Sequence, residues 1–319
     1  MSTVEAVCVG ETMALLLPGN APFREATQFT LGQAGAESNV AVALARLGVT
    51  SAWVSRLGAD EVGDRVCAAL GAENVDLTGV VRSTSRPTGL FLKMPSGEKR
   101  KVVYYRQGSA ASELARADVE RAFDRMPRVA HFTGISPALS ASCDDAIEFA
   151  LREGRLRGIV TSFDVNYREV LWPSAAVASQ RLAELAQLAD VVFVGADEAT
   201  LLWGTTSARD IAAHLAGAGT VVVKNAEIGA TEISEGRESF ERALRVDVVE
   251  SVGAGDAFAG GWLAAYLRGA DASVRLRSAH LMAASALRSN DDHGEALSWK
   301  HVSERAAHSE LWQANEGDN

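Results

Sequence analysis

The sequence is poor in cysteine and has no long apolar run. Its three cysteines, Cys8, Cys67 and Cys143, are scattered and form no C-x-x-C pair, a pattern that argues against both a disulfide framework and a structural zinc site. No segment approaches the roughly eighteen consecutive apolar residues of a membrane span. The amino terminus also lacks the basic stretch of a signal peptide. These absences predict a cytoplasmic protein that does not enter a membrane.

Basic residues are fewer than acidic ones, with 31 Lys and Arg against 41 Asp and Glu. The formal net charge is -10, which argues against a nucleic-acid partner because clustered lysine and arginine supply the affinity for a phosphate backbone. The sequence contains no phosphate-loop motif of the form G-x-x-x-x-G-K-[ST], so a nucleotide would have to be held in another way. A few local cations and helix amides can still hold a small anion in an acidic protein.

Short apolar segments alternate with helical patterns along most of the 319 residues. This alternation predicts an α/β fold with a mostly parallel sheet. The chain shows no internal repeat and no linker rich in proline or serine, so we expect a single domain over residues 1–319. The main strands are expected at 4–9, 51–57, 129–133, 159–164, 191–194, 221–224, 231–233 and 245–248, and the main helices within 32–48, 60–70, 257–267 and 276–287.

The rhythm changes between residues 88 and 110. Two apolar segments flank a polar turn at 96–99, which is typical of a β-hairpin. A short exposed strand is also expected at 27–31, just before a glycine-rich loop. We expect the hairpin to lie outside the main sheet.

The segment SVGAGDAF, at residues 251–258, carries the strongest chemical signal. Gly253, Ala254 and Gly255 are small enough to let backbone amides approach an anion, and they stand at the start of an apolar helix pattern. Asp256 could then accept a proton from a hydroxyl while the start of the helix stabilises a transferring phosphoryl group. The alternative is a tight glycine turn followed by an ordinary helix cap.

Two segments resemble the signatures of the ribokinase-like, or PfkB, family of carbohydrate kinases. Residues 250–256, ESVGAGD, resemble the family's D-T-x-G-A-G-D segment, with Glu250 and Ser251 in place of Asp and Thr. Residues 32–48, GQAGAESNVAVALARLG, resemble the family's substrate-side signature, in which small residues and an asparagine meet the sugar. The resemblance covers nearly the whole chain.

The substrate-side signature implies that Gly35, Ala36 and Asn39 contact the substrate. An asparagine offers donors and an acceptor to a polyol, and a glycine leaves room for a ligand against the backbone. On spacing alone, the same residues could instead form a glycine turn followed by a helix cap.

Within this family, some segments are similar to those of 2-keto-3-deoxygluconate kinases. The similarity implies that Tyr104 or Tyr105, together with Arg106 and Arg168, contacts a sugar acid. Guanidinium groups bind a carboxylate in a two-pronged fashion, and a neutral sugar has no such group. Arg106 could instead be an exposed residue of the hairpin. The segments concerned are GAE at 35–37, YYRQGSAAS at 104–112 and FDVNYREVLW at 163–172.

On the nucleotide side, VVVKNAEIGATEIS resembles the family's K-x-G-x-x-G segment, with Ala226 where the first glycine is usual. This match, the D-x-N-x-R segment and the GAGD segment together imply a set of contacts with ATP. The residues expected to make them are Asn166, Arg168, Lys224, Gly229, Ala230, Gly253 and Gly255.

Two acidic residues are further candidates. Glu198 lies in FVGADEATLLWG, which corresponds to the family's N-x-x-E region, and it could organise water bound to a metal ion or be a charge on a helix surface. Asp292 lies in SNDDHGEAL, which resembles the family's R-R-G-D-x-x-G-x-P region and implies a place beside the substrate. The adjacent Asp291 leaves the register open, and a solvated acidic loop is the alternative.

The resemblance implies a ribokinase-like fold, with helices on both faces of a central, mostly parallel sheet and a small β-sheet lid from about residues 28–34 and 87–112. It implies that ATP with Mg²⁺, and a monovalent cation such as K⁺, serves the phosphorylation of 2-keto-3-deoxy-D-gluconate at its primary hydroxyl. Lids of this family often pair across a dimer, which implies a homodimer or a higher homo-oligomer. The alternatives are a sister kinase for fructose, ribose or 5-dehydro-2-deoxygluconate, and a sugar-acid sensor that has lost catalysis.

Overall fold

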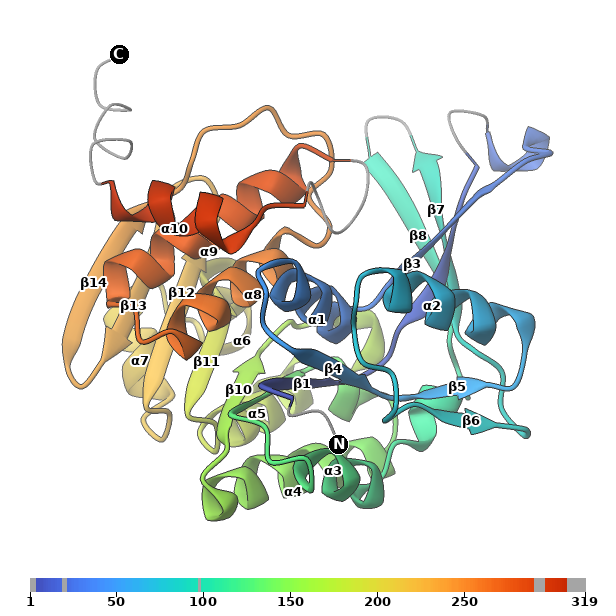
Figure 1. Cartoon of the computed structure of the whole chain (residues 1–319), viewed down its shortest axis with the longest axis horizontal. Coiled ribbons are helices and arrows are strands. Elements are labelled where there is room, and N and C mark those ends of the chain that lie inside the picture. Colours follow the sequence, from blue (N-terminus) through green and yellow to red (C-terminus); the bar gives the residue numbers. More distant parts are fainter. Residues whose placement is uncertain (1–3, 19–21, 97–98, 290–295, 309–319) are drawn as a thin grey trace.

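A large, mostly parallel sheet runs through the centre of the chain (Figure 1). The structure, a computed structural model, describes residues 4–18, 22–96, 99–289 and 296–308. All neighbouring strands of the sheet pair in parallel except the last two along one edge. From that edge to the other, the strands are β14 (Arg237–Arg242), β13 (Gly229–Ser234), β12 (Thr220–Asn225), β11 (Val191–Gly195), β10 (Val160–Asp164), β9 (Val129–Thr133), β1 (Ala6–Val9) and β4 (Ser51–Val54).

The central strands are buried on both faces, as expected for the middle of an α/β fold. Strand β11 has the sequence VVFVG, and every one of its residues is buried. Its side chains alternate between two cores, with Val192 and Val194 in one and Val191 and Phe193 in the other. This alternation is the period of two that a strand requires. The predicted α/β architecture is therefore confirmed.

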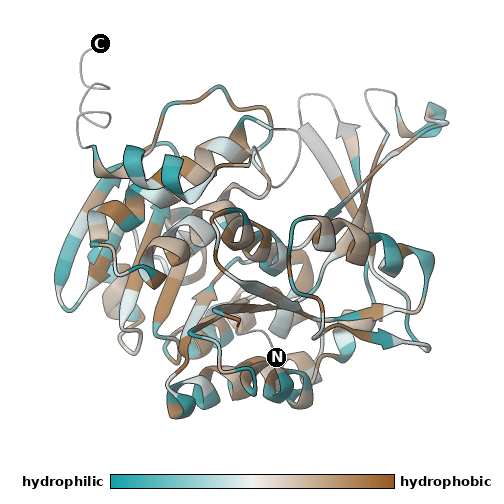
Figure 2. Cartoon of the chain, in the orientation of Figure 1, coloured by the Kyte–Doolittle hydropathy of each residue, from teal (hydrophilic) through white to brown (hydrophobic). Residues whose placement is uncertain are grey.

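Helices cover both faces of the sheet, and Figure 2 shows the apolar residues concentrated on the central strands. Among the described residues, no helix combines the length and the apolar character that crossing a bilayer requires. On the face of Phe193 lie α1 (Ala36–Arg46), α2 (Glu61–Ala72), α8 (Ala254–Leu267), α9 (Ala272–Leu287) and α10 (Trp299–Ala307). On the opposite face lie α3 (Arg116–Phe123), α4 (Ala141–Arg157), α5 (Ala175–Ala186), α6 (Ala196–Trp203) and α7 (Ala208–His214). Short 3-10 helices occupy Phe23–Glu25, Ala110–Glu113, Ser136–Ala138 and Glu169–Leu171.

A second, smaller sheet stands beside the ends of the parallel strands (Figure 1). Its inner pair is parallel, and each outer strand is antiparallel to its neighbour. Met13, Leu15 and Phe91 form a small apolar core on one side of it. The strands of this small sheet are, in order, β3 (Thr30–Ala34), β2 (Met13–Leu17), β7 (Leu90–Ser96) and β8 (Lys99–Tyr105). A separate two-stranded ladder joins β5 (Arg56–Gly58) to β6 (Val81–Ser83).

Most predicted elements are present, and the differences concern edge strands. The hairpin around 96–99 is confirmed as β7 and β8. The strand expected at 245–248 is wrong, because that segment is irregular and the last strand is β14, with the sequence RESFER. Charged residues on an exposed edge strand hide the apolar pattern of a strand. The strand expected at 27–31 lies further along, in β3, and the pattern does not predict β2.

Candidate active site

A cavity of about 1170 Å³ opens where the parallel strands end. In α/β proteins, ligands bind at this edge of the sheet. Glu11 follows β1, Asp164 and Gly195 end β10 and β11, and Lys224 lies near the end of β12. The starts of α1 and α8, the small sheet and part of α9 complete the walls.

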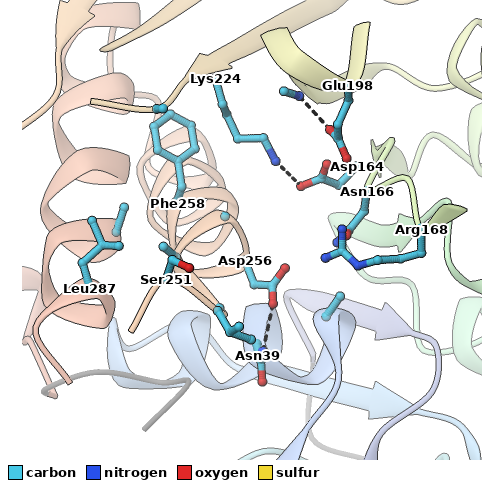
Figure 3. Close-up of a pocket in the computed structure, with 18 of the residues that line it drawn as sticks. Asn39, Asp164, Asn166, Arg168, Glu198, Lys224, Ser251, Asp256, Phe258 and Leu287 are labelled. Carbon is cyan, nitrogen blue, oxygen red and sulfur yellow. Dashed lines mark hydrogen bonds and ion pairs between the residues drawn. The ribbon is translucent and has the colours of Figure 1, made fainter. Parts of the chain in front are cut away.

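Asp256 lies in the first turn of α8 and faces the cavity (Figure 3). Gly253 is the N-cap of this helix, and its φ of 83° lies in the left-handed region that favours glycine. The side-chain Nδ2 of Asn39 in α1 donates to Oδ2 of Asp256 at 2.8 Å. The Oδ1 atom of Asn39 is buried and has no hydrogen-bond partner among the described residues. Asn39 therefore holds Asp256 and keeps an acceptor for a ligand hydroxyl.

The pKa of the Asp256 carboxyl is raised to about 7, chiefly because burial disfavours its charged form. The hydrogen bond from Asn39 opposes this increase, and so do the charges of Arg168 and Lys224, whereas the charge of Asp164 adds to it. A carboxyl with a pKa near neutrality can accept a proton and release it again at physiological pH. These surroundings favour a proton acceptor over an ordinary exposed helix cap.

The start of α8 presents backbone amides to the same cavity. Gly253, Ala254 and Gly255 all line it, and the N-cap residue, Gly253, has no side chain that could cap the first turn. A Cβ atom at Gly255 would make an ordinary van der Waals contact, 3.5 Å long, with Nζ of Lys224. The ammonium group of Lys224 therefore lies next to the first turn of α8. A helix start beside a lysine is suited to bind an anion such as phosphate.

Lys224 and two carboxylates form a charged cluster on the floor of the cavity (Figure 3). Nζ of Lys224 contacts Oδ2 of Asp164 at 2.6 Å. Burial would lower the pKa of Lys224, but the charges of Asp164 and Glu198 outweigh it, and the pKa is raised. Burial also raises the pKa of Glu198. Its two oxygens accept the backbone N–H groups of Tyr167 at 2.7 Å and Gly195 at 2.8 Å.

The same cluster offers oxygen ligands to a hard cation. The Oδ1 atom of Asp164 is buried without a hydrogen-bond partner in the described part of the chain. Mg²⁺ is commonly held by one or two carboxylates, by water and by the phosphates of a substrate. No group of three or more His, Cys, Asp or Glu side chains within the described ranges could enclose a metal ion. The donor set therefore fits an ion that arrives with a phosphate ligand.

The small sheet adds aromatic and cationic side chains to the cavity. Tyr104 lines it, whereas Tyr105, the next residue in β8, is 61% exposed and lies outside the lining. Nε of Arg106 donates to Oε2 of Glu11 at 2.7 Å, and the other oxygen of Glu11 accepts from the Ser109 hydroxyl at 2.5 Å. Arg106 is therefore a largely buried wall residue whose charge is balanced, and not an exposed residue of the hairpin.

The start of α1 forms the adjoining wall. Gly35 is the N-cap of α1 and lines the cavity together with Ala36. A Cβ atom at Gly35 would come within 2.3 Å of the carbonyl oxygen of Glu11, so this close approach requires glycine. Glu37 is fully buried instead, where it accepts the hydroxyl of Thr133 at 2.7 Å and where burial raises its pKa. Glu37 therefore anchors α1 on the main sheet.

The loop after β10 brings Asn166 and Arg168 into the wall of the cavity near Asp256. Both line the cavity, and Figure 3 shows the guanidinium of Arg168 extending toward Asp256. One of its nitrogens donates to the carbonyl of Tyr167 at 3.1 Å. Asn166 has a φ of 38°, a left-handed conformation that asparagine tolerates better than most residues.

The residues predicted for the nucleotide side divide into two groups. Lys224 and Gly229 line the cavity, but Ala230 is 1% exposed and packs in the core. Ala226 lines the cavity with a φ of 42°, so an alanine occupies the left-handed conformation that favours glycine. An apolar wall faces this segment, formed by Val246, Val248, Phe258, Ala283 and Leu287.

Some residues fall outside these groups. Asp292 lies outside the described residues. Asp164 and Lys93 line the cavity although the sequence did not single them out as site residues. Asp164 could have been found because it is the last residue of a buried parallel strand, where such folds place functional groups. Lys93 could not, because its position depends on how the small sheet packs.

Comparisons with known proteins show similarity over most of the chain. The model of the pfkB family carbohydrate kinases matches residues 4–294. A curated relative, the 2-dehydro-3-deoxygluconokinase of Bacillus subtilis (strain 168), is 40% identical over 272 residues, which cover 83% of this chain and 84% of the relative.

Solved structures show the same similarity. A PfkB protein from Polaromonas sp. JS666 matches with a TM-score of 0.86 and 33% identity, over 96% of this chain and 100% of that protein. A fructokinase with bound ATP from Xylella fastidiosa matches with a TM-score of 0.82 and 25% identity, over 98% of this chain and 99% of that protein.

Proposed function

The chain belongs to the pfkB family of carbohydrate kinases, and we propose that it transfers the γ-phosphoryl group of ATP to the primary hydroxyl of 2-keto-3-deoxy-D-gluconate. The products would be 2-keto-3-deoxy-6-phosphogluconate and ADP. The observation that carries the proposal is the position of Asp256, whose carboxyl, with a pKa of about 7, lies at the start of α8 beside a cavity of suitable size. The similarity to the Bacillus subtilis kinase supports the choice of sugar.

Phosphoryl transfer would proceed in one displacement. Asp256 accepts the proton of the sugar hydroxyl, and the hydroxyl oxygen forms a bond to the γ-phosphorus. The bond between the γ-phosphorus and the bridging oxygen breaks, and ADP leaves with the electron pair. The amides of Gly253 to Asp256 and the ammonium of Lys224 stabilise the charge that spreads over the phosphoryl oxygens.

ATP would lie along the other half of the cavity. Its phosphates are proposed to contact Lys224 and the start of α8, and its base the apolar wall near Leu287. Asp164 and Glu198 would hold Mg²⁺, which neutralises phosphate oxygens when it is bound. A monovalent cation such as K⁺ would accompany them. Dependence of the rate on Mg²⁺ is measured by titration after chelation, and dependence on K⁺ by titration in a buffer whose only other monovalent cation is a bulky organic one.

The two arginines suit the carboxylate of a sugar acid. Arg168 extends toward Asp256 from one wall, and Arg106 stands on the other beside Tyr104. A carboxylate between them would receive charge-assisted hydrogen bonds. The substrate hydroxyls would meet Asn39 and the backbone near Gly35.

We treat the chain as one domain whose small sheet is a lid. Its closure would exclude water and suppress hydrolysis of ATP. The face of the lid that turns away from the cavity exposes Leu31 by 41% and Tyr105 by 61%, which suits contact with a second copy of the chain. Sedimentation analysis of the purified protein would report the expected homodimer or higher homo-oligomer.

The first experiment is ADP release with 2-keto-3-deoxygluconate, its galactonate epimer, fructose and ribose. Wild type, Asp256→Asn and Arg168→Gln are compared. We expect activity on a keto-deoxy acid, its loss in Asp256→Asn, and a KM for the acid raised about tenfold or more in Arg168→Gln. Activity on neutral sugars only would contradict the proposed substrate. Full activity of Asp256→Asn would contradict the proposed base.

A neutral sugar such as fructose is the second candidate, because one observation favours it. The charge of Arg106 is already balanced by Glu11, so this arginine does not require an anionic substrate. In that case Arg168→Gln would leave the KM for fructose nearly unchanged.

A further inference from the structure

The small sheet contacts the main body through an ion pair that the reaction scheme does not use. Lys93 lies in β7, and Glu250 lies in the segment that leads into α8. Nζ of Lys93 and Oε2 of Glu250 are 3.1 Å apart, and the two side chains are only 3% and 10% exposed. Charged side chains are almost never buried to this extent unless they are paired.

Glu250 also fixes the loop ahead of α8. Its Oε1 atom accepts the backbone N–H groups of Ser251 at 3.0 Å and Val252 at 3.3 Å. The backbone N–H of Glu250 itself donates to the carbonyl oxygen of Leu287 in α9 at 3.3 Å. One residue therefore joins the small sheet, the loop and α9.

Both ends of the pair are adjacent to functional groups. The loop held by Glu250 ends at Gly253, the N-cap whose helix carries Asp256. Lys93 pairs with Val102 in the register of β7 and β8, and the next pair on the same face is Phe91 with Tyr104. All four of these strand residues line the cavity. Because Lys93 and Tyr104 lie on the same face of two paired strands, Lys93 moves together with the wall that carries Tyr104.

The energetics of a buried ion pair favour a role in positioning over one in stability. The cost of removing two charges from water offsets most of their attraction, so the net contribution to stability is small. Removing one partner is costly because it leaves the other charge buried. Such a pair selects one arrangement of the two surfaces that it joins, since any other arrangement separates the charges.

We propose that Lys93 and Glu250 are a positioning pair that couples the seating of the small sheet to the arrangement of the amides at the start of α8. The inference rests on the proposed phosphoryl transfer, and it names the residue pair that couples the covering of the sugar to that reaction. When the sheet covers the sugar, Lys93 holds Glu250, and Glu250 holds the loop that presents the amides to phosphate. Without the pair, the small sheet and the amides at the start of α8 would change position independently of each other. Water would then reach the phosphoryl group more often.

A double-mutant cycle tests the coupling. The variants are Lys93→Met, Glu250→Gln, the combination of both, and Lys93→Arg as a conservative replacement. The readouts are kcat and KM for sugar and ATP, and ATP hydrolysis without sugar. Each single variant is expected to lower kcat about tenfold and to raise the ratio of hydrolysis to sugar phosphorylation, and the double variant to be no worse than either. Lys93→Arg should retain most of the activity.

A matched control is the exposed ion pair of Arg209 and Glu238, whose atoms are 2.6 Å apart. Arg209→Met and Glu238→Gln should change neither kcat nor the hydrolysis ratio. If the losses of Lys93→Met and Glu250→Gln simply add, or if the hydrolysis ratio does not move, the proposal is wrong. Should a single variant fail to fold, the double variant, which removes both charges, still gives the ratio.

The test also separates this inference from the proposed function. If wild type phosphorylates no sugar of the panel, the proposed substrate is wrong, and the coupling is then read from ATP affinity by titration calorimetry. Equal weakening of ATP binding in both single variants and in the double variant supports the pair. Unchanged ATP affinity in all of them overturns it.

Discussion

Asn39 and Asp256 are separated by 217 residues in the sequence and are joined by a hydrogen bond of 2.8 Å. The contact depends on how closely α1 and α8 pack. A Cβ atom at Gly260 of α8 would lie only 2.5 Å from the Cβ atom of Ala43 in α1. These small residues let the helices approach until their first turns meet at the cavity.

This contact predicts the pH dependence of the reaction. The value of kcat/KM should rise with pH as Asp256 loses its proton, with a midpoint of about 7. Asn39→Ala removes a hydrogen bond that lowers the pKa of Asp256, so its midpoint should lie at higher pH. Initial rates of both proteins across the neutral range give the midpoints. A midpoint that moves to lower pH in Asn39→Ala would contradict this assignment.

Asp256→Asn should lose activity and gain stability. We expect kcat to fall by about 10² to 10⁴ because the proton acceptor is gone. The folded-state pKa of about 7 lies above the ordinary value of 3.8, so stability from this group is present at acid pH and is lost as the pH rises through 7. Near pH 8 the variant should therefore be more stable, by about 1 to 2 kcal/mol after allowing for solvent in the cavity.

Chemical denaturation at acid and at alkaline pH measures that difference. The stabilisation should shrink at acid pH, where the carboxyl of the wild type is protonated and uncharged. A variant that is less stable than the wild type at both pH values would show that burial of the Asp256 charge carries no cost.

Tyr104 and Tyr105 form a matched pair on opposite faces of β8. Tyr104→Ala should raise the KM for the sugar about tenfold, because Tyr104 lines the cavity. Tyr105→Ala should leave it nearly unchanged, since Tyr105 is 61% exposed on the other face. Steady-state kinetics of the two variants gives both KM values. A larger effect of Tyr105→Ala would contradict the assignment of the Tyr104 face of β8 to the cavity.

Ala226→Gly should stabilise the protein. The φ of 42° at Ala226 is unfavourable for a residue with a Cβ atom, and we expect a gain of up to about 1 kcal/mol after the entropy of glycine in the unfolded chain is counted. Thermal unfolding measures it. Ala230→Gly is the control, because Ala230 is buried in a strand, and this change should destabilise. Destabilisation in both variants would argue against strain at Ala226.

Features that depend on neighbouring residues in the sequence were predicted better than contacts between residues far apart in it. The positions of the buried strands along the chain follow from local apolar runs, and Gly253 and Asp256 were predicted as site residues from the short GAGD motif. Asn39 was predicted from the resemblance of residues 32–48 to the substrate-side signature of the family. The pairing of Arg106 with Glu11 could not be predicted, because it depends on β8 ending beside β1. The contact between Lys93 and Glu250 has the same origin.

The edge strands were harder to predict from the sequence for a related reason. A central strand is buried on both faces and reads as an apolar run, as in VVFVG of β11. The outer strand β14 has charged residues at four of its six positions and one large apolar residue, Phe240. Its partner β13 supplies the pairing that makes it a strand. Such strands depend on their neighbours, which the local sequence does not reveal.

The small sheet leaves and rejoins the main body at four places: between β1 and β2, between β3 and α1, ahead of β7 and after β8. Two of these connections pass close to other atoms, since a Cβ atom would come within 2.3 Å of a backbone oxygen at Gly35 and within 2.9 Å of a side chain at Gly89. Closure of the small sheet over the cavity must therefore be accommodated in four connections at once, and not in a single hinge. A ligand that draws the small sheet inward therefore acts at the same time on the end of β1 and on the start of α1, which the chain joins directly to that sheet.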